Sequence, residues 1–158
     1  MTEYKLFAKN LICVCIDSFD NYDYNGRIWN QYDEKPSLFY GCVDMVSQMD
    51  ELYDKWKFPQ KANKYRTFNK KKEVVNTYQN ILRGGSKMSI HNIQDKRGDK
   101  GTFVVQVQYR QNSTWQGQVI WAEKNKKEYF RSALELMKLI DSAMSEENAD
   151  KEADSSVS

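Results

Sequence analysis

Hydrophobic and polar residues alternate along two short stretches of the chain, 12–17 and 103–110. In the later stretch one side carries Phe103, Val105, Val107 and Tyr109, and the other carries Gln106, Gln108 and Arg110. In the earlier stretch one side carries Ile12, Val14 and Ile16, and the other carries Cys13, Cys15 and Asp17. Because successive side chains of a strand point to opposite faces, both stretches are predicted to be strands with one face in a core.

Two further strands are predicted after each of these. Turn-rich residues at 20–25 and 111–114 come first, where Asn and Asp side chains can bond their own backbone. Second strands are then expected over 26–32 and 117–122. A polar turn leads in each case to a short third strand, which ends at Phe39 or at Phe130.

Apolar residues at helical spacing predict a helix at the end of each half. The first stripe contains Cys42, Val43, Val46, Met49, Tyr53 and Trp56, and the second contains Ala133, Leu134, Met137, Ile140 and Met144. Gly41 is the expected N-cap of the first helix. Ser132 and Glu135 have the spacing of a capping box, in which the serine hydroxyl accepts a hydrogen bond from the glutamate amide.

The two halves repeat one pattern at a constant offset of 91 residues, over 11–52 and 102–143. Asn21, Gly26, Phe39 and Asp50 recur as Asn112, Gly117, Phe130 and Asp141 without a gap. Such self-similarity indicates an internal duplication. The expected fold class is α+β, with two tandem β-β-β-α repeats packed with pseudo-twofold symmetry.

This pattern divides the chain into four parts. The first repeat is expected over 1–54, a basic connector over 55–101, the second repeat over 102–144 and a disordered acidic tail over 145–158. The tail has almost nothing apolar to bury. Each repeat of about 42 residues is near the lower limit for an independent core, so the repeats should fold by packing on each other.

Apolar residues also occupy the sheet face that points away from each predicted helix. They are Cys13, Trp29, Val104 and Ile120. These side chains either bury against each other, joining two sheets into a sandwich, or form a docking surface for a partner. Burial within the chain is the favoured interpretation.

The net charge of +2 hides a strong partition along the sequence. Residues 1–54 carry −6, residues 55–100 carry +10 and residues 101–158 carry −2. This asymmetry concerns partners and solubility rather than the fold.

The segment 55–72 combines lysine and arginine with aromatic residues and contains no acidic residue. The residues expected to contact nucleic acid are Lys55, Lys57, Lys61, Lys64, Arg66, Lys70, Lys71 and Lys72, with Tyr65 and Phe68. Cations neutralise phosphates and aromatic rings stack on unpaired bases, so this composition suits single-stranded nucleic acid. The alternative is that Trp56 and Phe58 complete the core of the first helix and that the lysines only solubilise a loop.

Few residues suggest catalysis. His91 is the single histidine, and the three cysteines are adequately explained as small hydrophobes in a packed layer. Zinc would need about four ligands, and Cys13, Cys15, Cys42 and His91 lack the spacing of a zinc motif. No phosphate-binding glycine motif occurs. The sequence therefore favours a protein that is not an enzyme and uses no cofactor or metal.

Two acidic features bear on catalysis and metal binding. Asp50 and Asp141 are repeated, so a pseudo-twofold axis would either bring them together as a carboxylate dyad or leave each to accept hydrogen bonds separately. The second outcome is favoured. Asp17, Asp20 and Asp23 resemble part of a calcium loop, but the glycine and glutamate that complete such a loop are missing.

A cytoplasmic location is expected. An odd number of cysteines excludes complete intrachain disulfide pairing, and no apolar stretch has the length of a signal sequence or a membrane span.

Two strings of the second half carry a resemblance to known sequences: WQGQVIW at 115–121 and FRSALEL at 130–136. In these strings, and around 26–29 and 58–60, the chain resembles a family of small uncharacterised bacterial proteins. The resemblance implies a bacterial cytoplasmic origin, on mobile DNA, and carries over no functional residues.

The function expected from these observations is that of a non-catalytic interaction protein. It would act as an accessory or inhibitory factor that docks on a protein or nucleoprotein partner. The competing expectation is a direct single-stranded nucleic-acid binder that works through 55–72.

Overall fold

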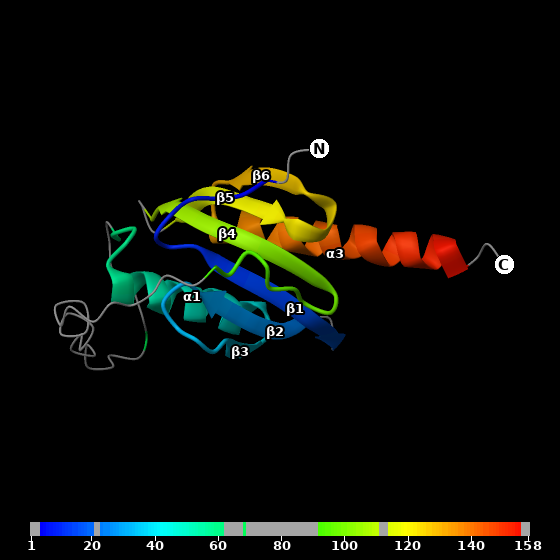
Figure 1. Ribbon diagram of the computed structural model, residues 1–158, viewed down its shortest axis with the longest axis horizontal. Coiled ribbons are helices and arrows are strands. Elements are labelled where there is room, and N and C mark those ends of the chain that lie inside the picture. The colour runs from blue at the N-terminus through cyan, green and yellow to red at the C-terminus, as the bar shows by residue number, and fades with distance from the viewer. Residues whose placement is uncertain (1–3, 21–22, 62–67, 69–91, 111–113, 156–158) are drawn as a thin grey trace.

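A computed structural model gives the three-dimensional structure of the chain (Figure 1). It describes residues 4–20, 23–61, 68, 92–110 and 114–155, and in 148–155 only the backbone. The elements are β1 (Ile12–Asp20), β2 (Asp23–Asn30), β3 (Ser37–Tyr40), α1 (Cys42–Trp56), β4 (Gly101–Tyr109), β5 (Gln116–Trp121), the short 3-10 helix η2 (Ala122–Lys124), β6 (Lys126–Phe130) and α3 (Ala133–Ser155). The fold class is therefore α+β, as the alternating pattern predicts.

The strands form one six-stranded antiparallel sheet in the order β3-β2-β1-β4-β5-β6. The first strands of the two halves are neighbours at its centre. In their shared ladder Ile12 faces Val105, Cys13 faces Val104 and Val14 faces Phe103. Each half therefore contributes three strands in the same order, counted outward from the centre.

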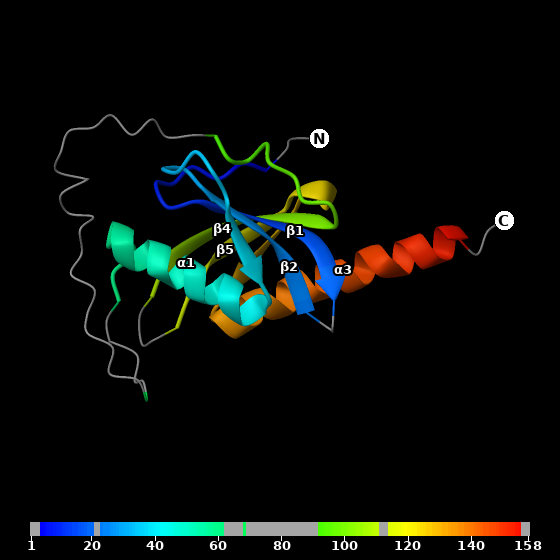
Figure 2. The same ribbon diagram turned by 90° about the horizontal axis from the view of Figure 1, so that it is seen from below.

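Both helices lie on one face of this sheet (Figure 2). The core between helices and sheet combines residues of both halves. Its largest fully buried members are Ile12, Ile16, Ile28, Phe39, Met45, Met49, Tyr53, Trp115, Phe130 and Leu136. Burial of this shared apolar surface, rather than local propensity, stabilises the two small halves.

A second, smaller apolar cluster covers the middle of the opposite face. There the sheet residues Cys13, Cys15, Val104 and Ile120 pack under Leu6 of the N-terminal segment and Ile93 of the 92–100 segment, with Trp29 at the margin. Figure 2 shows both segments crossing this face. Burial within the chain is thus confirmed for Cys13, Val104 and Ile120, whereas the alternative of two sheets joined as a sandwich is wrong, because all strands pair in one sheet.

Each half contains a β-bulge at the same place. The register shifts between Ile16 and Ser18 in β1, and between Val107 and Tyr109 in β4. A glycine of the neighbouring strand lies against each bulge. A Cβ on Gly26 would lie 1.9 Å from the Cys15 carbonyl oxygen, and one on Gly117 would lie 2.0 Å from that of Gln106. The two matched glycines are thus explained by a backbone approach that leaves no room for a side chain.

The bulge corrects the predicted orientation of two residues in the second half. Tyr109 was expected in the core and Arg110 on the opposite face, but Tyr109 is exposed and Arg110 is buried on the helix side. A bulge adds one residue to a strand, so every residue after it moves to the other face. Strict alternation therefore predicts Phe103, Val105 and Val107 correctly and fails after the bulge.

The helical stripes also need correction at one matched pair. Val43 and Leu134 were expected in the core, yet their side chains are 78% and 57% exposed. Met45 and Leu136, which the stripes omitted, are fully buried in their place. Both errors fall in the first turn, where the helix direction, set by the preceding strand, decides which side chain faces the sheet.

The N-terminus of α3 has the expected serine cap. The Glu135 amide donates to the Ser132 hydroxyl at 3.0 Å. The Glu135 carboxylate accepts from the backbone amide of Arg131, at 3.0 Å, rather than from that of Ser132. The helix continues to Ser155, so the predicted disordered tail differs from the structure over 145–155. Alanine, glutamate and lysine have high helix propensity, and the packed N-terminal half of α3 supplies the nucleus from which such residues extend a helix.

We expect Phe39→Ala and Phe130→Ala each to destabilise the protein by about 3–5 kcal/mol, the range for emptying a core aromatic site. Both rings are buried between a terminal strand and its helix. Chemical denaturation measures the loss in free energy of unfolding. Phe7→Ala serves as the control, because that ring is 90% exposed and its removal should change stability little. A loss near zero for either core variant contradicts the assignment.

Candidate interaction surfaces

The basic segment predicted to contact nucleic acid is described only in part. Lys55 lies in the last turn of α1, Lys57 caps that helix in a left-handed conformation, and Lys61 follows after Pro59. Phe68 is fully exposed. The remaining predicted contacts lie outside the described residues: Lys64, Tyr65, Arg66, Lys70, Lys71 and Lys72.

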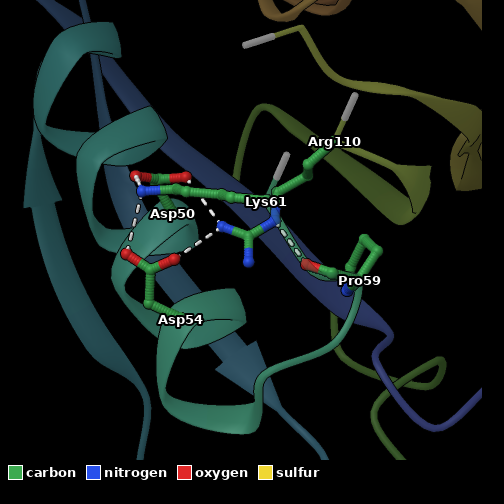
Figure 3. A network of polar contacts seen from close by, with 5 residues as sticks. All are labelled: Asp50, Asp54, Pro59, Lys61 and Arg110. Carbon is green, nitrogen blue, oxygen red and sulfur yellow. Dashed lines mark hydrogen bonds and ion pairs between the residues drawn. The ribbon is translucent and has the colours of Figure 1, made fainter. Parts of the chain in front are cut away.

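Lys61 belongs to a network that joins the two halves of the molecule (Figure 3). Its ammonium lies 3.0 Å from Asp50 and 3.0 Å from Asp54, two carboxylates one helical turn apart on α1. Arg110, after β4, donates through Nη1 to the same two carboxylates, at 3.1 Å and 2.8 Å. Its Nε donates to the Pro59 carbonyl at 2.6 Å. Two cations and two carboxylates thus hold the start of the basic segment against the sheet.

The charge of Lys61 is used in ion pairs within this network, so it does not add to an exposed basic surface. Partial burial disfavours its charged form, but hydrogen bonds to Asp54 and Asp50 outweigh that cost and raise the pKa of Lys61 above its ordinary value. The Arg110 side chain is only 2% exposed, so its charge is also used within the protein. Neither cation is therefore oriented for a phosphate.

Aromatic side chains gather at the C-terminal end of α1. Trp56 is half-buried against the main core and lies 5.2 Å from the Tyr32 ring. Its contacts agree with the alternative in which Trp56 completes the core of the first helix. Phe58 is 37% exposed, with the Lys9 ammonium 4.2 Å from its ring centroid. Lys9, Lys57 and Phe58 are thus the described basic and aromatic groups at this end with exposed side chains.

The repeated carboxylates Asp50 and Asp141 have separate partners. Asp50 binds Arg110 and Lys61, whereas Asp141 accepts a hydrogen bond from the Tyr24 hydroxyl of β2. Burial, together with the Asp141 carboxylate, raises the pKa of Tyr24. Each carboxylate therefore ties its helix to a strand of the other half, which is the separate-partner alternative and not a dyad.

The cysteines are placed as packed side chains. Cys13 and Cys15 are buried in the second cluster, and the hydrogen bond to Cys15 and burial raise the pKa of Cys13 well above its ordinary value. Burial, aided by Asp23, raises the pKa of Cys42 to about 11. Cys13 and Cys42 are therefore protonated near neutral pH, which disfavours them as nucleophiles.

Within the described ranges, no group of three or more histidine, cysteine, aspartate or glutamate side chains is arranged to hold a metal ion. His91 is not among those residues. A hollow between Tyr4, Gln94 and Asn125 has a cavity volume of about 10 Å³, room for about one water molecule and far below that of a small-molecule site.

Exposed apolar side chains lie at the outer edge of the first half. Leu38 and Tyr40 of β3 are 57% and 71% exposed, and Val43 follows them in the first turn of α1. These three residues are called the β3–α1 patch. Sequence reasoning missed the patch because it assigned Val43 to the core. A signal was present, since Leu38, Phe39 and Tyr40 are apolar on both faces of one short strand.

The outer edge of the second half repeats part of this pattern. Tyr129 and Leu134, offset by 91 residues from Leu38 and Val43, are 63% and 57% exposed. Arg131 stands at the position of Tyr40. Both ends of the sheet thus present apolar groups at matching positions, beside different charges.

No protein-family model, no curated protein and no solved structure matches this chain. Among the helices that the structure describes, none combines the length and the apolar character needed to cross a lipid bilayer.

We expect Arg110→Met to destabilise the protein by about 3 kcal/mol, the lower end for a buried ion pair that loses one partner. The value belongs at the lower end because Asp50 and Asp54 keep some solvent contact and retain Lys61. Urea denaturation measures the change. Arg131→Met is the matched control, since removal of the exposed Arg131–Glu135 pair should change stability little. Equal losses for the two variants would contradict a structural role for Arg110.

Proposed function

We propose that the protein is a non-catalytic interaction protein, an accessory or inhibitory factor that docks on a protein or nucleoprotein partner. The observation that carries this proposal is the β3–α1 patch, where Leu38 and Tyr40 of β3 and Val43 of α1 expose apolar side chains close together in the sequence. Apolar groups held in solvent cost free energy unless a partner covers them. The polar groups with catalytic potential are used elsewhere, since Asp50, Arg110 and Asp141 hold the two halves together.

A second part of the proposal is that the chain is a duplicated β-β-β-α unit with pseudo-twofold symmetry. The central ladder supports it, because Cys13 pairs with Val104, its own counterpart at the offset of 91 residues. A twofold axis through that pair exchanges Ile12–Val105 with Val14–Phe103. The matched bulges and glycines also support it. Duplication explains why apolar surface appears at both ends of the sheet.

The docking proposal is tested by placing a photo-crosslinking amino acid at Tyr40 in the β3–α1 patch. The control position is Glu51, which is exposed on α1 outside the β3–α1 patch. In the native host, Tyr40 should give a discrete crosslinked species that Glu51 does not give. Leu38→Ser combined with Val43→Ser should abolish that species while the thermal midpoint stays within a few degrees of wild type. Identical crosslinks from both positions, or none from Tyr40, would refute docking through this patch.

The alternative function is direct binding of single-stranded nucleic acid through 55–72. Exposed Phe68, and Phe58 beside Lys9, favour it, because aromatic faces next to cations suit unpaired bases. The use of Lys61 within the Asp50–Asp54 network counts against it.

A salt titration separates these functions. Replacing Lys70, Lys71 and Lys72 with Gln should lower the log–log salt slope for a single-stranded oligonucleotide by about 2–3 units, because each lost phosphate contact contributes about 0.7–0.9. The control replaces Lys124, Lys126 and Lys127 with Gln and removes the same charge outside the segment. Wild-type protein that binds neither single-stranded DNA nor RNA at about 50 mM salt would eliminate this alternative.

A further inference from the structure

The two outer strands of the sheet, β3 and β6, differ in how their free edges are treated. An edge strand presents backbone N–H and C=O groups that no neighbouring strand satisfies, and such groups pair readily with another extended chain. In an antiparallel strand these outward groups belong to alternate residues. On β3 they are those of Leu38 and Tyr40, as their contacts with α1 show.

Side chains of α1 close the β3 edge. The Tyr40 amide donates to the Asp44 carboxylate at 2.9 Å. The Leu38 carbonyl accepts from the Gln48 side-chain amide at 2.7 Å. One outward donor and one outward acceptor of a four-residue strand are therefore already paired within the protein.

The β6 edge has only the first of these two closures. The Arg131 amide donates to Glu135, which matches the pair between Tyr40 and Asp44 at the offset of 91 residues. Because the backbone amide of Arg131 points away from β5, the backbone N–H and C=O groups of Tyr129 and Lys127 point away from β5 too. At the position of Gln48, α3 carries Leu139, whose side chain cannot donate a hydrogen bond. Among the described residues, none donates a hydrogen bond to the Tyr129 carbonyl, so this edge is open.

The charged side chains around β6 indicate which kind of extended chain would pair with its open edge. Residues 124–131 contain Lys124, Lys126, Lys127 and Arg131 against Glu128, a net charge of +3. Lys126 and Arg131 also form exposed ion pairs with Glu146 and Glu135 of α3. Pairing of β6 with a second copy of itself would bring these like charges together across the ladder, which is unfavourable. Pairing with the β3 edge of a second copy is also unfavourable, because Asp44 and Gln48 already bond the outward groups of that edge. An acidic extended segment would satisfy the outward backbone groups and meet Lys127. It would also compete with Glu146 and Glu135 for Lys126 and Arg131, whose exposed ion pairs contribute little.

We propose that the β6 edge binds an extended acidic segment of a partner protein, which adds to the sheet as a further strand beside β6. Backbone hydrogen bonds to Lys127 and Tyr129 hold the segment, and its carboxylates lie against the flanking lysines and arginine. The exposed Tyr129 ring supplies the apolar contact on one face. This inference rests on the proposed docking function but uses the opposite end of the sheet from the β3–α1 patch.

The test uses a fluorescent peptide of four Glu-Val repeats and fluorescence anisotropy at low salt. A peptide of four Glu-Pro repeats has the same charge but lacks alternate N–H groups and cannot complete a ladder. The Glu-Val peptide should bind and the Glu-Pro peptide should bind at least about tenfold more weakly, as expected from the loss of one or more hydrogen bonds. Equal affinities would show charge attraction alone and overturn the proposal.

Two variants locate the site. Leu139→Gln gives α3 the same side chain that Gln48 provides on α1, so it should bond the Tyr129 carbonyl and weaken Glu-Val binding about tenfold. Leu139→Met keeps an apolar side chain and should not weaken binding. In wild-type protein the Tyr129 amide should gain protection from hydrogen exchange when the peptide binds. Absence of Glu-Val binding, an unprotected Tyr129 amide, or equal affinity of the Gln and Met variants overturns the proposal. Crosslinking from Tyr40 does not depend on any of these three results, so failure of the β6 proposal can be distinguished from failure of the proposed function.

Discussion

The antiparallel pairing of β1 with β4 is the contact on which the rest of the structure depends. Each half has only three strands and one helix, too little apolar surface for a separate core. The central ladder turns two small sheets into one, so both helices can cover a shared face. The residues along that ladder, from Ile12 to Ile16 and from Gly101 to Val105, are buried on both sides of the sheet. Each helix is then tied to the opposite half, α1 through Arg110 and α3 through Tyr24.

One bulge in β4 has consequences for the charge of the whole surface. It turns Arg110 toward α1, where Asp50 and Asp54 need a cation, and it turns Tyr109 out. The same carboxylates take Lys61 from the basic segment. One lysine of a segment that is strongly basic in sequence is therefore neutralised within the protein. The charge left for a partner is smaller than a count of lysines indicates.

The two edges of the sheet, β3 and β6, differ in the helix side chains beside them. A glutamine on α1 closes part of the β3 edge, whereas a leucine stands at the matching place on α3. Natural sheets protect their edges by covering them or by charging them. Here the covered edge lies beside apolar Leu38, Tyr40 and Val43, and the charged edge lies beside Tyr129. Under the proposed duplication and docking function, these few differences between the halves give one protein two distinct docking ends.

The amino-acid pattern alone determined the α+β class, the order of the strands and helices, and most of the core, because period-two and helical spacing are local properties. It also located the two glycines and the serine cap of α3. It failed at Arg110, Val43 and Leu134, because a bulge and the direction of a helix's first turn depend on the neighbouring strand. Among the residues predicted to contact nucleic acid, the sequence did not show that Lys61 has two partners on α1, Asp50 and Asp54. The apolar patch, the open edge and the pairing of the halves were decided by tertiary structure, since each depends on which distant segment covers a given backbone group or side chain.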